Sequence, residues 1–152
     1  MVRPTPFDST RRYPVVFEVY GGPGSQQVYD AFNSSGWTQL LSQHGYIVIG
    51  VNNRGTNNYG SAFMKIVYRN LGKWESHDFA ETARYLAKLP YVDAHHIAIM
   101  GTSYGGYSTL FTMASYPDLF TVGIANSPVT DWRLYDSRTE EHKSELQAPM
   151  YL

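Results

Sequence analysis

The amino-acid sequence predicts an α/β protein built around a parallel sheet. Short apolar runs alternate along the chain with stretches of helical periodicity, the pattern of parallel strands joined by helices. The run at 46–51 is apolar at almost every position, as expected for a strand covered on both faces. The run at 97–100 leads into Gly101-Thr102-Ser103-Tyr104-Gly105, the Gly-x-Ser-x-Gly pattern of a tight turn between a strand and a helix.

The first part of the chain supplies two strands and one helix. Residues 1–13 are polar and contain prolines, so we expect an N-terminal loop. Residues 14–20 are β-branched and aromatic, which predicts a strand, and a second strand follows at 46–51. Between them, a helix is expected to stop at Gly45. Its apolar residues on one face are Trp37, Leu40 and Leu41.

The middle of the chain supplies two further helical stretches. Residues 52–59 are rich in turn-forming residues, and residues 61–73 suggest a partly buried helix. A clearer helix is predicted to begin near Asp78, which has capping-box spacing to Glu81, and to end at Pro90. Its predicted apolar face consists of Phe79, Ala83 and Leu86.

The last predicted elements surround the Gly-x-Ser-x-Gly turn. A strand at 97–100 precedes the turn, a helix follows Ser103, and another strand is expected at 121–125. Because active sites of such sheets lie at the carboxyl ends of the strands, the loops at 20–24, 52–60 and 127–135 should surround Ser103.

The residue types of the turn suit nucleophilic chemistry. A side chain at Gly101 or Gly105 would collide with the neighbouring strand and helix, and glycine also tolerates unusual dihedral angles. Ser103 would stand at a helix N-terminus, where free N–H groups favour developing negative charge. The alternative is a glycine-rich turn that happens to contain serine.

The composition limits the classes of function. The chain has 152 residues, which predicts one domain, and a formal net charge of −1 gives no case for binding nucleic acid or an anionic membrane. With no cysteine there is no disulfide or cysteine-bound metal, and no spacing of His, Asp and Glu suggests another metal site or cofactor. We find no signal peptide and no apolar run of the ~18 residues that a membrane span needs.

Four ordered blocks resemble the prolyl oligopeptidase family of serine peptidases, and the dipeptidyl peptidase IV branch most of all. The blocks are YPVVFEVYGGPGSQ at 13–26, NRGTNNYG at 53–60, GTSYGGY at 101–107 and SPVTDWRLYDS at 127–137. The resemblance implies an α/β-hydrolase fold and cleavage after the second residue from a free peptide N-terminus, often after proline. Relatives of this kind are often secreted, periplasmic or membrane-anchored, and the sequence itself does not indicate a compartment.

The resemblance also implies roles for particular residues. Ser103 matches the nucleophile, and Tyr20 and the backbone N–H of Tyr104 match the two donors that stabilise the oxyanion. Three residues match the lining of a small pocket that accepts proline: Val129, Trp132 and Tyr135. The residues alone favour a different interpretation of Tyr20, as a strand-end aromatic residue that packs on the following loop. For the three pocket residues, packing of the loop under the sheet edge is an equally good interpretation. Arg54 matches a loop arginine near the site, but we expect a solvated turn residue.

The chain is expected to hold only part of that catalytic domain. A serine triad also needs a carboxylate and a histidine, and the family places both beyond the last strand predicted here. We therefore predict a partial domain at 14–137, lacking the first and last strands of the fold, with a divergent charged tail at 138–152. Asp131 or Asp136 with His142 would have the right order for a triad, but His142 lies in a charged run typical of a solvated segment.

Three hypotheses follow. The chain belongs to a serine exopeptidase that forms an acyl-enzyme at Ser103, to an esterase or acylaminoacyl-type peptidase with the same fold, or to a catalytically silent binding piece. The expected partner is a peptide substrate, without nucleic acid and with no indication of a membrane. Open sheet edges make a homo-oligomer possible.

Overall fold

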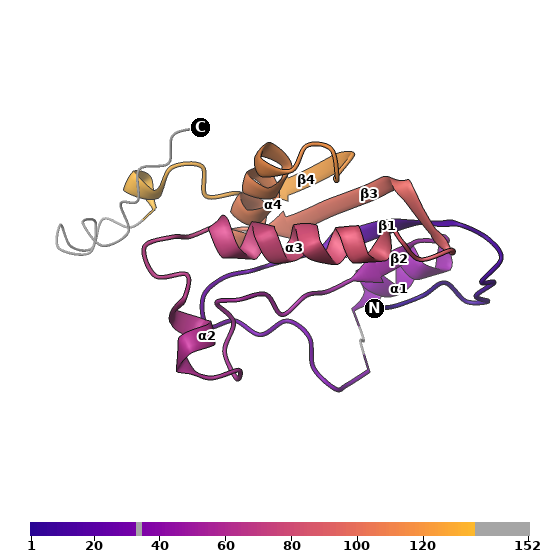
Figure 1. Cartoon of the computed structure of the whole chain (residues 1–152), viewed down its shortest axis with the longest axis horizontal. Coiled ribbons are helices and arrows are strands. Elements are labelled where there is room, and N and C mark those ends of the chain that lie inside the picture. Colours follow the sequence, from indigo (N-terminus) through magenta and orange to yellow (C-terminus); the bar gives the residue numbers. More distant parts are fainter. Residues whose placement is uncertain (33–34, 136–152) are drawn as a thin grey trace.

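The computed structural model describes residues 1–32 and 35–135 and shows the predicted α/β architecture (Figure 1). All four described strands are parallel, in the order β2-β1-β3-β4. The strands are β1 (Tyr13–Glu18), β2 (Ile47–Ile49), β3 (Val92–Thr102) and β4 (Val122–Asn126). The helices are α1 (Gly36–Gln43), α2 (Ser61–Lys65), α3 (Lys73–Leu86), α4 (Tyr104–Ser115) and the short 3-10 helix η1 (Trp132–Leu134).

The core lies between α3 and the strands β1, β2 and β3, and α3 lies over one face of the sheet in Figure 1. Phe17 of β1 and Ile99 of β3 are paired in register, and both are fully buried. Phe79 and Leu86 of α3 pack into the same cluster. Burial of a large apolar side chain is worth about 1.5–3 kcal/mol, so this cluster holds β1 and β3 rigidly beneath the site.

The helix predicted to begin at Asp78 begins five residues earlier, at Lys73, and it ends at Leu86 rather than Pro90. Asp78 does not cap it. The Asp78 carboxylate accepts the backbone N–H of Arg54 at 2.7 Å, a contact 24 positions away that no local pattern reveals. Of the partly buried helix predicted over 61–73, only Ser61–Lys65 is helical before α3 begins.

The helix predicted around Trp37 is present as α1, but its apolar face is turned outward. Trp37 and Leu40 are 49% and 44% exposed, whereas Thr38 and Ser42 are buried. The Thr38 hydroxyl donates to Glu18 Oε2 at 2.8 Å, and the Ser42 hydroxyl donates to the Arg3 carbonyl at 3.0 Å. Polar contacts to β1 and to the N-terminal segment therefore fix the orientation of α1.

Strand pairing extends beyond the predicted strands in two places. Val2, within the predicted N-terminal loop, forms an antiparallel bridge to Val48 of β2. β3 is longer than predicted and includes His95 and His96. No helix in the described part of the chain is both long and apolar enough to cross a membrane.

Candidate active site

Ser103 stands alone between β3, which ends at Thr102, and α4, which begins at Tyr104. Its φ of 60° and ψ of −119° form a backbone conformation that residues other than glycine rarely adopt. The Ser103 N–H donates to the Asn126 carbonyl at 2.9 Å, so β4 holds the turn from one side. The side chain is partly exposed and makes no capping hydrogen bond to α4. The turn therefore places Ser103, partly exposed, at the carboxyl edge of the sheet.

Two glycines allow this turn to lie against β1. A Cβ on Gly101 would lie 2.4 Å from the Val19 carbonyl oxygen, and one on Gly105 would lie 2.3 Å from the same atom. The predicted collision with the neighbouring strand is confirmed. Neither glycine has a positive φ, however, so the unusual dihedral angles belong to Ser103 itself.

Tyr20 is the next residue after Val19, whose carbonyl approaches the two glycines. Its ring centroid lies 5.9 Å from that of Tyr104, and its carbonyl accepts the Ser108 hydroxyl of α4 at 3.2 Å. A Cβ on Gly22 would lie 2.4 Å from Tyr20 Cε1, so the glycine loop leaves room for the ring. With 40% of its surface exposed, Tyr20 is a partly open aromatic residue beside the turn.

The segment after β4 places an aromatic cluster against the first turn of α4. The Trp132 ring lies 5.7 Å from Tyr104, 5.2 Å from Tyr107 and 5.3 Å from Tyr135, centroid to centroid. Val129 is partly buried in the same segment. Trp132 and Tyr135 are thus brought together next to the turn. Tyr107, which contacts Trp132, is largely buried, and this burial raises the pKa of its hydroxyl to about 12.

One buried acid in this region was missed by the sequence analysis. Glu75 of α3 is fully buried, and its Oε1 accepts the Tyr104 hydroxyl at 2.7 Å. Burial raises the pKa of the Glu75 carboxyl, although the Tyr104 hydroxyl and the nearby amides of the first turn of α3 oppose the shift. Burial and the Glu75 charge raise the pKa of Tyr104 in turn. In the sequence, Glu75 could have been noticed because it lies on the same helical stripe as the apolar residues Phe79, Ala83 and Leu86.

The expectation that Arg54 is a solvated turn residue is wrong. Its Nη2 lies 2.6 Å from Asp78 Oδ1, and its guanidinium carbon lies 4.1 Å from the centroid of the Trp74 ring. The hydrogen bond to Asp78 raises the pKa of Arg54. Arg54 therefore ties the loop after β2 to α3.

Among the described histidines, none is hydrogen-bonded to Ser103. His44 contacts the Leu40 carbonyl, His77 contacts Arg54, and His96 contacts Asp93. Asp131 is paired with Arg133 at 2.6 Å, which holds the pKa of its carboxyl below the ordinary range. Asp136 and His142, the other candidates for a triad, lie outside the described residues. The described residues also contain no group of three potential metal ligands.

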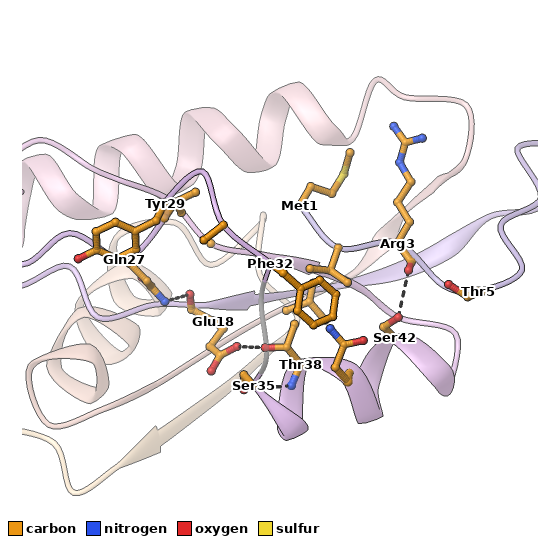
Figure 2. Close-up of a pocket in the computed structure, with 16 residues that line it drawn as sticks. Met1, Arg3, Thr5, Glu18, Gln27, Tyr29, Phe32, Ser35, Thr38 and Ser42 are labelled. Atoms are coloured by element: carbon orange, nitrogen blue, oxygen red, sulfur yellow. Dashed lines mark hydrogen bonds between the residues drawn. The ribbon is translucent and has the colours of Figure 1, made fainter.

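A concavity of about 750 Å³ lies elsewhere, along the β2 edge of the sheet (Figure 2). Residues of the N-terminal segment, the loop after β1 and α1 line it, and Figure 2 shows Glu18 and Thr38 joined on its wall. None of the site residues discussed above lines this concavity.

Comparison with known proteins gives a consistent result. Residues 32–150 match the model of the prolyl oligopeptidase family. A Schizosaccharomyces pombe protein that carries the name dipeptidyl aminopeptidase is 46% identical over 98% of this chain. A Talaromyces marneffei protein named as a dipeptidyl-aminopeptidase B is 51% identical over 89% of it. The chain spans only 19% and 15% of the lengths of these curated relatives.

Solved structures agree with the sequence matches. The crystal structure of Porphyromonas gingivalis dipeptidyl peptidase 4 superposes with a TM-score of 0.86 at 43% identity, covering 97% of this chain and 21% of that one. A structure from Bacteroides ovatus, named as a dipeptidyl aminopeptidase IV, gives 0.86 at 37% identity, covering 95% and 22%. The four-stranded sheet and its helices therefore correspond to part of a larger fold of the α/β-hydrolase type.

Proposed function

Because this chain belongs to the prolyl oligopeptidase family, we propose that it carries the nucleophile, the oxyanion donors and part of the substrate pocket of a serine dipeptidyl peptidase. The observation that carries the proposal is the conformation of Ser103 between β3 and α4. Residues 14–137 supply this part of the catalytic domain.

The chemistry is acyl transfer. The Ser103 oxygen attacks the carbonyl carbon of a peptide bond, its proton passes to a base, and the tetrahedral intermediate releases the amine and leaves an acyl-enzyme. Water then hydrolyses the ester and restores the hydroxyl. None of the described histidines is hydrogen-bonded to Ser103, so the described contacts assign the role of this base to no residue.

The Tyr20 hydroxyl and the Tyr104 N–H are the donors to the oxyanion. Loss of one such donor typically lowers kcat by about 10²–10³-fold. The substrate is a peptide with a free N-terminus, cut after its second residue. Support comes from the names of the relatives and from the aromatic cluster of Trp132 and Tyr135 beside the turn, whose flat rings suit a proline side chain.

The first experiment asks whether Ser103 is activated. The protein, in the longest form that its gene encodes, is treated with a fluorophosphonate probe and the labelled peptide is mapped. We expect labelling at Ser103 that Ser103→Ala abolishes. Ser115→Ala is the matched control, because Ser115 is an exposed serine at the far end of the same helix. Labelling that persists in Ser103→Ala, or absent labelling of the folded protein, would contradict the proposal.

A second measurement separates a dipeptidyl peptidase from the related enzyme classes. Gly-Pro and Ala-Pro chromogenic amides should be cleaved, and blocking their amino group should abolish cleavage. Preference for simple esters or for N-acylated peptides would instead support an esterase or an acylaminoacyl-type peptidase.

A further inference from the structure

Glu75 occupies a position that apolar packing alone does not explain. It is 0% exposed and lies on the stripe of α3 that otherwise carries Phe79, Ala83 and Leu86. Its Oε2 has no hydrogen-bond partner among the described residues. A buried carboxyl of this kind costs stability unless it contributes something in return. Its Oε1 accepts the 2.7 Å hydrogen bond from the Tyr104 hydroxyl, and the amides of the first turn of α3 lie near the carboxyl.

Tyr104 is the residue through which that contact reaches the site. It is the first residue of α4, next to Ser103, and only 7% of its surface is exposed. Its ring lies 5.9 Å from Tyr20 and 5.7 Å from Trp132, centroid to centroid. The Tyr104 ring therefore lies between Tyr20 and Trp132. Glu75 accepts the hydrogen bond from the hydroxyl at the end of this ring.

We propose that Glu75 is a positioning residue for the reaction at Ser103. By anchoring the Tyr104 hydroxyl, it fixes the Tyr104 backbone N–H where the oxyanion forms and keeps the Tyr20 ring beside it. The expected effect of Glu75 on the reaction at Ser103 rests on the proposed function. The anchoring itself is a statement about the structure and can be measured separately.

The geometry explains why a distant acid has this effect. The turn at Ser103 is held in a rare conformation, and such conformations persist only when surrounding contacts determine them. The Asn126 carbonyl holds the Ser103 N–H from the β4 side. Glu75 holds the next residue from the α3 side, so the turn is fixed between two elements. A displacement of about 1 Å in such a site can cost 10²-fold in rate.

The test uses Glu75→Leu, Glu75→Gln and Tyr104→Phe in the longest form that the gene encodes. Glutamine keeps an acceptor oxygen for the tyrosine, leucine keeps the volume without it, and phenylalanine removes only the donor. We expect kcat on Ala-Pro amides to fall about 10- to 100-fold in Glu75→Leu and Tyr104→Phe, with KM changing less than about 3-fold. Glu75→Gln should stay within about 3-fold of the unmodified protein.

A second readout does not depend on activity. Hydrogen–deuterium exchange of the segment 101–107 should accelerate in Glu75→Leu and Tyr104→Phe and stay unchanged in Glu75→Gln, while exchange of β2 stays the same in all of them. If exchange and kcat are unchanged in Glu75→Leu and Tyr104→Phe, the inference is wrong even when Ser103 reacts with the probe. If exchange accelerates but Ser103 never reacts, the anchoring stands and the proposed function fails.

Discussion

Glu75 combines a titratable group with complete burial, so its charge state should affect stability. Burial raises the pKa of its carboxyl above the ordinary value of 4.5. The raised pKa means that folding favours the neutral acid. Its stabilising contribution is therefore fully present below about pH 4.5 and is lost as the pH rises through the raised value. The tyrosines that interact with Glu75 from α4 are Tyr104 and Tyr107, and both have raised pKa values, so they stay neutral over this range.

This predicts a pH-dependent difference between the unmodified protein and Glu75→Gln. The melting temperature of the unmodified protein should decline relative to that of the variant between pH 4.5 and pH 8, because only the carboxyl can ionise. Each unit of pKa shift is worth about 1.4 kcal/mol, which corresponds to about 3–6 °C in a domain of this size. Glu81→Gln is the control, because Glu81 is an exposed glutamate on the same helix. A difference that is constant across the range would contradict the prediction.

At the scale of elements, the strand-to-helix turn depends on close approach of backbones. Gly105→Ala should destabilise the protein by about 2–3 kcal/mol, because its Cβ would meet the Val19 carbonyl at 2.3 Å and a backbone atom cannot move aside. Gly36→Ala is the matched control, since Gly36 is also helical and a Cβ there meets nothing within 4 Å. Urea unfolding measures both. We expect Gly36→Ala to be neutral or slightly stabilising, and a comparable loss in the two variants would contradict the steric argument.

The elements that the sequence predicted well are those determined by local pattern. The strands near 14–20 and 121–125 are apolar or β-branched, and β1 and β4 lie there. The start of α3 was misplaced because Asp78 looks like a cap locally, whereas its partner Arg54 is brought near only by the fold. The outward face of α1 depends in the same way on Glu18 and Arg3, which are distant in sequence.

The residues of the candidate site also differ in whether a local pattern could predict them. Ser103 was predicted from a local motif, and the resemblance to a family supplied Tyr20 and Trp132. Glu75 was missed because its role depends on Tyr104, which lies 29 positions away. A charged residue on an apolar helical stripe is the signal that a sequence can offer for such a contact.

At the scale of the whole molecule, the sheet has an apolar edge at β4, which lies at one end of the sheet in Figure 1. Val122 and Ile124 are 51% and 54% exposed, and Leu110 of the adjoining α4 is 44% exposed. Among the described residues, no strand pairs with the free side of β4. An uncovered apolar edge of this kind is a template for pairing with another chain.

The 152-residue chain should therefore associate at micromolar concentration, and Ile124→Lys should weaken the association, because a charge on an edge strand disfavours pairing between strands. Tyr85→Lys is the control. It adds the same charge and removes an exposed aromatic side chain, but Tyr85 is 64% exposed on α3, away from the sheet edge. Size-exclusion chromatography over a range of concentrations should show large species that diminish in Ile124→Lys and persist in Tyr85→Lys. A single monomer peak for the unmodified chain, with cooperative melting, would show that the β4 edge does not promote association.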